Sequence, residues 1–182
     1  MDAKTEERLY RLLDERDIQD VLQRYCRGVD RCDAEIIASC YHDDAIDDHG
    51  NWTVRGPEAP TAIIERVKPG KDAAMHFLGN IQIEVDGDVA FTECYLLAFR
   101  SSEKDGRSYT RTRAVRFVDR FERRAGEWRI SERVVVDDWN RIDEVVEKMG
   151  DTDRFRYGSK DKTDPVYAIR KGRVARSPGG NS

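Results

Sequence analysis

The stretch that decides the fold is IQIEVDGDVAF, residues 81–91 of a chain of 182 residues. In its first half apolar residues alternate with polar ones, and a period of two is typical of a strand with one buried face. Asp86-Gly87 then predicts a tight turn, because an Asp-Gly pair adopts the backbone conformation that a two-residue hairpin needs. The chain therefore enters an antiparallel sheet here.

The alternation of a sheet continues downstream. A polar loop is predicted at residues 101–107, before a long strand that contains Val115, Phe117 and Phe121. A turn at residues 124–126 then precedes the last strand, at residues 128–139. The C-terminal half of the domain is thus predicted to be an antiparallel meander.

Upstream of the hairpin the apolar period is close to 3.6, which predicts helices. The first covers residues 5–29, with Thr5 as its N-cap, and a second, shorter helix begins at Asp33. A short strand at residues 45–52 and a turn that contains Pro57 lead into a third helix.

Three helices followed by a meander predict an α+β fold in which a curved antiparallel sheet wraps around the helices. We expect residues 1–139 to form this domain. Residues 140–182 are expected to form a C-terminal helix, around residues 142–149, and an extended tail that docks on its own or a neighbouring subunit.

The composition excludes several classes of protein. Hydrophobic residues make up 38% and charged residues 37% of the chain, and no apolar run approaches the roughly 20 residues of a membrane-spanning helix. The 32 basic and 36 acidic residues are well mixed and give a net charge of −4, which argues against nucleic acid as a partner. The N-terminus lacks the apolar stretch of a secretory signal, so we expect a cytoplasmic protein whose four cysteines are reduced.

Two histidines, His42 and His49, have aspartates between and beside them, which are side chains that can bind metal. Their spacing matches no zinc pattern, so we expect no metal site and interpret the segment as a solvated acidic loop and strand edge.

Three other side chains could carry chemistry. Asp30 falls at the end of a predicted helix, where the helix dipole disfavours a carboxylate, so it is either a solvated link residue or a functional group. Tyr25 lies on the apolar stripe of that helix and is interpreted, from position alone, as a core tyrosine whose hydroxyl needs a polar partner. His76 would face away from Ile81 unless Gly79 marks a bulge; it is either a satisfied core residue or a general base.

Several arginines follow on the last two long strands, and most are interpreted as part of a solvated face. One that points inward could hold a substrate oxygen or a leaving group.

The order of the elements and three segments resemble a known family. The segments are GVDR at residues 28–31, HFLGN at residues 76–80 and ERRAGEWRIS at residues 122–131. Together they are similar to the SnoaL-like branch of the nuclear-transport-factor-2-like superfamily over residues 5–139. Within that branch the similarity is greatest to the lyases hexachlorocyclohexane dehydrochlorinase, scytalone dehydratase and bile acid dehydratase.

The resemblance implies a cone-shaped α+β barrel with a deep apolar pocket and neither a metal nor an organic cofactor. By the same match, His76 would be the base, Asp30 the carboxylate that orients it, and Tyr25 and Arg133 the groups that assist the departing group. The residues that we expect to contact substrate are Tyr41, Trp52, Phe77, Tyr95 and Arg113.

These expectations define a cofactor-independent lyase that takes a proton from a hydrophobic alicyclic or aromatic substrate and eliminates water, halide or formaldehyde. Two alternatives stay open: a non-catalytic protein, either the small subunit of a ring-hydroxylating dioxygenase or a ligand-binding scaffold, and an isomerase or polyketide cyclase. Members of the superfamily are often oligomers, and we expect a homo-oligomer, with a trimer favoured.

Overall fold

The computed structural model describes residues 1–68, 74–147, 149–150 and 155–170. Its N-terminal part comprises α1 (Ala3–Asp30), α2 (Ala34–Ala38), β1 (Tyr41–Asp48), β2 (Thr53–Arg55), the 3-10 turn η1 (Gly56–Glu58) and α3 (Ala59–Val67). Four long strands and a short helix follow, namely β3 (Met75–Asp86), β4 (Val89–Lys104), β5 (Arg107–Arg124), β6 (Glu127–Glu144) and α4 (Pro165–Arg170). No helix among these described residues is long and apolar enough to cross a membrane.

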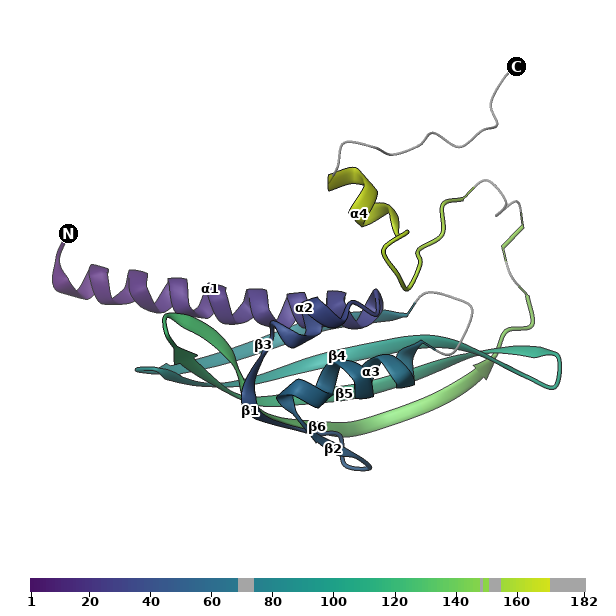
Figure 1. Cartoon of the computed structure of the whole chain (residues 1–182), viewed down its shortest axis with the longest axis horizontal. Helices are drawn as coiled ribbons and strands as arrows, with labels where there is room; N and C mark the ends of the chain where they lie inside the picture. Colours follow the sequence, from purple (N-terminus) through teal and green to yellow (C-terminus); the bar gives the residue numbers. More distant parts are fainter. Residues whose placement is uncertain (69–73, 148, 151–154, 171–182) are drawn as a thin grey trace, which may run out of the picture.

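The strands form one curved sheet in the order β2-β1-β6-β5-β4-β3. All neighbouring strands are antiparallel except β1 and β6, which run parallel. Figure 1 shows α1, α2 and α3 on one side of this sheet, which is curved but not closed. The predicted α+β cone is therefore confirmed.

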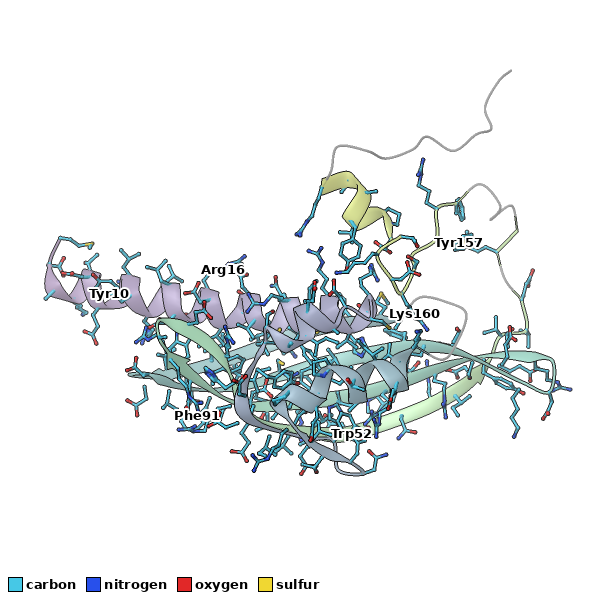
Figure 2. The ribbon with its side chains drawn as sticks, in the orientation of Figure 1. Tyr10, Arg16, Trp52, Phe91, Tyr157 and Lys160 are labelled. Carbon is cyan, nitrogen blue, oxygen red and sulfur yellow. The ribbon has the colours of Figure 1, made fainter. Side chains whose placement is uncertain are left out.

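The core lies between the sheet and the C-terminal half of α1. Ile18, Leu22 and Val29 are buried there, whereas Leu9 and Tyr10 are exposed on the N-terminal turns. These turns extend beyond the sheet, as Tyr10 shows in Figure 2. The N-cap of α1 is Asp2, which accepts a hydrogen bond from the Thr5 backbone N–H, so the predicted N-cap was wrong by three residues.

A β-bulge in β3 decides which way His76 faces. The pairing of β3 with β4 shifts register between Gly79 and Gln82, and Asn80 has a φ of 46°. Both His76 and Ile81 are consequently partly buried on the inner face, while Phe77 on the alternate position is exposed. The sequence left open whether Gly79 marks a bulge, and the structure confirms that it does. The extra residue places His76, before the bulge, on the same face as Ile81, after it.

Three predicted elements need correction. The helix expected around residues 142–149 is wrong, because β6 continues to Glu144 and Ile142 pairs with Arg111 of β5. The loop at residues 101–107 shrinks to a two-residue turn, since β4 and β5 pair along this length. The strand expected at residues 45–52 begins earlier, as β1, and a separate β2 follows it.

Candidate active site

The side chains of His76 and Asp30 meet where the end of α1 faces the start of β3. His76 Nδ1 lies 2.6 Å from Asp30 Oδ1, and the His76 backbone N–H donates to Asp30 Oδ2 at 3.2 Å. The two side chains are only 12% and 15% exposed. Since a carboxylate only accepts hydrogen bonds, this contact selects the tautomer of a neutral imidazole that has its proton on Nδ1 and its lone pair on Nε2. The contact therefore fixes both the tautomer and the orientation of the ring.

A groove of about 470 Å³ lies beside this pair, between α1 and β3. Its walls are formed by Gln19, Gln23, Cys26, Arg27, Asp30, Arg31, His76, Phe77, Leu78 and Ile81. The resemblance implied a deep apolar pocket, but amide and guanidinium groups make up much of this lining. A ligand in the groove meets hydrogen-bond donors as well as apolar side chains.

Arg27 contributes the most distinctive donors to the groove. Its Nε and Nη2 atoms are shielded from solvent, and neither has a hydrogen-bond partner among the described residues. A buried donor without a partner carries a desolvation cost that a ligand oxygen could remove.

Tyr25 and Arg133 form a second, separate cluster in the core. Arg133 is fully buried and donates to both oxygens of Asp119, from Nε at 2.8 Å and from Nη2 at 2.7 Å. Its guanidinium carbon lies 4.2 Å from the ring centre of Tyr25 and 3.9 Å from that of Phe117. Burial raises the pKa of the Tyr25 hydroxyl well above its usual value. Burial disfavours the charge of Arg133, but Asp119 outweighs this effect and raises the pKa of the guanidinium.

The four predicted catalytic residues thus lie in two pairs rather than around one recess. Neither Tyr25 nor Arg133 lines the groove beside His76. Tyr25 precedes Asp30 by five residues on α1, which corresponds to about 7.5 Å along the helix axis. Arg133 Nη1 is buried and has no hydrogen-bond partner within the described part of the chain.

The predicted substrate contacts are distributed over several places. Phe77 lines the groove, whereas Trp52 and Arg113 line a second recess on the same side of the sheet. Tyr41 is buried, and its hydroxyl donates to Asp47 at 3.0 Å. Tyr95 is exposed, and strand alternation places it on the opposite face from Ala98, the residue that pairs with His76. Tyr95 therefore does not line the groove beside His76.

Sequence reasoning missed Asp119 and the polar residues of the groove. Asp119 stands between Phe117 and Phe121 at alternate positions of β5, and all three side chains are buried. An acidic residue at an inward position of an apolar strand is a signal for a buried ion pair, and it was available in the sequence.

The C-terminal segment, residues 159–170, packs against the same chain at the C-terminal end of α1. The Tyr167 hydroxyl donates to Asp33 at 2.6 Å, Lys162 pairs with the same carboxylate, and Arg31 lies 3.2 Å from Asp164. Burial raises the pKa of Asp33, but the hydrogen bonds from Lys162 and Tyr167 outweigh it, so the pKa is lowered. The pKa of Asp164 is also lowered: burial raises it, but hydrogen bonds from backbone N–H groups prevail.

No group of three or more histidine, cysteine or acidic side chains that could hold a metal is found in the residues that the structure describes. His42 Nε2 lies 2.9 Å from the Glu122 carbonyl oxygen, and burial lowers the pKa of its ring. His49 instead stacks on Trp52, with ring centres 3.8 Å apart. The two histidines thus make unrelated contacts.

Comparison with known proteins places the chain in a family. The model of the SnoaL-like domain matches residues 10–134, so the chain belongs to the SnoaL-like domain family. No curated protein sequence matches it.

Solved structures share the fold. The structure of LinA is 25% identical in sequence, with a TM-score of 0.66, and the match covers 77% of this chain and 95% of that one. The hexachlorocyclohexane dehydrochlorinase LinA-type3 of Novosphingobium barchaimii is 24% identical, with a TM-score of 0.66 and the same coverage of 77% and 95%. A scytalone-dehydratase-like protein of Novosphingobium aromaticivorans is 19% identical, with a TM-score of 0.63, and the match covers 80% and 97% of the two chains. These neighbours have the same fold as the chain.

Proposed function

We propose that this protein is a cofactor-independent lyase in which His76 removes a proton from a substrate carbon. The contact that carries the proposal is the 2.6 Å hydrogen bond between His76 Nδ1 and Asp30. It leaves Nε2 of His76 with a free lone pair, and the adjacent carboxylate stabilises the imidazolium that forms when Nε2 takes up the proton. General-base assistance of this kind contributes roughly 10²–10⁴-fold to a rate.

The reaction is an elimination. The C–H bond breaks as its proton moves to His76 Nε2, the electron pair forms a C=C bond, and the bond to the leaving group on the neighbouring carbon breaks. Halide leaves as an anion, whereas hydroxide leaves as water after taking up a proton, which the His76 imidazolium returns. Only proton transfer and bond cleavage are involved, so the step requires neither a metal nor a redox cofactor.

The polarity of the groove favours an oxygen-bearing substrate. A chloride departs without a proton, but a hydroxyl or carbonyl oxygen needs donors that stabilise its developing negative charge. Gln19, Gln23 and Arg27 supply amide and guanidinium donors within the groove. We therefore place loss of an oxygen-bearing group, either water or formaldehyde, from an alicyclic or aromatic compound ahead of dehydrochlorination.

Tyr25 and Arg133 are proposed to assist the leaving group from the core side. Arg133 Nη1 supports this role, because it is a buried donor with no hydrogen-bond partner among the described residues and a developing anion could satisfy it. For Tyr25 the support is its position on the same helix as Asp30, five residues before it.

The experiment follows proton abstraction and elimination separately. Hydroxylated and chlorinated alicyclic and aromatic compounds are incubated in deuterated water, and mass spectrometry records deuterium uptake, product formation and released formaldehyde. Wild type is compared with His76→Ala and with Asp44→Asn, which removes an exposed carboxylate paired with Arg124.

We expect turnover in wild type and Asp44→Asn and its loss in His76→Ala. Deuterium uptake without elimination would identify an isomerase, which uses the same base. Turnover that survives in His76→Ala, or inertness of the wild type towards every compound, would contradict the proposal and favour a non-catalytic role.

A further inference from the structure

The second recess lies outside the groove and has a volume of about 730 Å³. It is bounded by α3, the β1–β2 turn, the C-terminal parts of β4 and β6 and the N-terminal part of β5. Its charged residues are Arg66, Arg100, Arg111, Arg113, Arg141, Glu65 and Asp137. We call it the arginine recess, because five guanidinium groups face only two carboxylates around it.

The recess lies on the same face of the sheet as His76. His76 pairs with Ala98 of β4, and Ala98 pairs with Arg113 of β5. Since neighbouring strands are about 4.8 Å apart, the backbones of His76 and Arg113 are separated by about 10 Å. The two recesses nevertheless share no lining residue.

Like charges are placed directly opposite each other in this recess. Arg100 and Arg111 form a cross-strand pair, and such a pair of equal charges is destabilising. Burial lowers the pKa of Arg100, and the neighbouring charges of Arg113 and Arg111 lower it further. Asp137 compensates Arg113, with Nε and Oδ1 3.0 Å apart, and Asp143 pairs with Arg141 at 2.9 Å, but among the described residues no acidic side chain forms an ion pair with Arg111. The positive charge is thus only partly balanced, in a chain whose net charge is −4.

Two of the guanidinium groups, those of Arg100 and Arg66, are also held in place. Arg100 Nη1 donates to the Arg66 carbonyl oxygen at 2.6 Å, and Arg66 Nη1 donates to the Ala62 carbonyl oxygen at 2.7 Å. The Arg66 guanidinium lies over the ring of Trp52, 4.3 Å from its centre, where the β1–β2 turn approaches α3 (Figure 2). A fixed array of donors binds a ligand with a smaller loss of conformational entropy than mobile side chains do.

We propose that the arginine recess binds the anionic group of a small ligand, a phosphate or a carboxylate. Guanidinium groups recognise both through paired, charge-assisted hydrogen bonds. An anion placed between Arg100 and Arg111 neutralises the repulsion of that pair, so its binding also stabilises the fold. The inference does not depend on the proposed lyase activity, because it involves none of the residues of the His76 groove.

Calorimetric titration at low ionic strength tests the proposal, with inorganic phosphate and succinate as separate probes. The variants are Arg100→Gln and Arg111→Gln. Arg129→Gln is the control, because it removes the same charge from an arginine that pairs with Glu127 outside the recess. His76→Ala is included to separate this site from the groove.

At least one probe is expected to bind wild type, and its affinity should fall about tenfold or more in each recess variant, since each variant loses charge-assisted hydrogen bonds. Arg129→Gln and His76→Ala should retain the wild-type affinity. Binding of phosphate alone identifies a phosphate ester as the ligand, and binding of succinate alone identifies a carboxylate. If neither probe binds, or if the recess variants bind as tightly as wild type, the proposal is wrong. Thermal unfolding of each variant confirms that it is folded.

Discussion

Asp30→Asn removes a negative charge from the neighbourhood of His76 while preserving the size of the side chain. The amide can still accept a hydrogen bond, so the substitution isolates the electrostatic effect of the carboxylate on the imidazolium. With charge centres about 4 Å apart and an effective dielectric constant of about 20, that interaction is worth about 4 kcal/mol. If the imidazolium were fully formed in the transition state, losing this interaction would lower the rate by roughly a factor of 10³. Since the charge is only partly developed in the transition state, we expect kcat/KM to fall by about 10²–10³.

The assay measures kcat/KM for elimination and the rate of deuterium uptake on the substrate that the wild type converts. Asp30→Glu keeps the charge but displaces it by one methylene, so it should retain more activity than Asp30→Asn. Asp44→Asn controls for the loss of one carboxylate elsewhere. Wild-type rates in a folded Asp30→Asn variant, or equal losses in the Asn and Glu variants, would refute the electrostatic reasoning.

Three further predictions concern stability, pH and assembly. Asp119→Ala leaves the buried charge of Arg133 unpaired and should lower the free energy of unfolding by about 3–5 kcal/mol in urea titrations; a loss below about 1 kcal/mol would contradict the buried pair. Because the pKa values of Asp33 and Asp164 are lowered, docking of residues 159–170 is fully stabilised above the usual carboxyl pKa and is lost as the pH falls through the folded values, below about pH 4. Hydrogen exchange should show this segment losing protection before the sheet, and simultaneous loss would argue against the contacts. The expected homo-oligomer should have a mass that is a multiple of 21.0 kDa in light scattering, and Val118→Arg on the exposed sheet face should reduce it; a 21.0 kDa wild type would exclude assembly through that face.

Local patterns were sufficient for most of the fold. The turns at Gly87 and Gly126 lie where Gly-containing pairs predicted them, and both glycines have positive φ. Asp33 caps α2 as expected, because its side chain accepts from the Ile36 backbone N–H. These features depend on a few neighbouring residues, so the sequence reveals them directly.

The failures involve partners that are distant in the chain. Ile142, Val145, Val146 and Met149 have helical spacing, but pairing with β5 supplies backbone hydrogen bonds that extend β6 through Ile142 to Glu144. The separation of Tyr25 and Arg133 from the groove could not be predicted either, because burial depth depends on how α1 crosses the sheet. The Asp30–His76 contact was predicted only through a family resemblance, since 46 residues separate the two side chains.

The bulge at Gly79 is a local feature of the backbone that makes a contact between distant residues possible. In a regular strand, His76 and Ile81 would lie on opposite faces of the sheet. The His76 side chain would then project from the outer face, which α1 does not cover. One additional residue, with Asn80 in the left-handed region that Asn tolerates better than most residues, brings the ring onto the inner face. The apolar residues in the remainder of β3 can then pack against the core, while the first residues of the strand line the groove. A local backbone irregularity thus allows one strand both to stabilise the cone and to present a base beside the carboxylate at the end of α1.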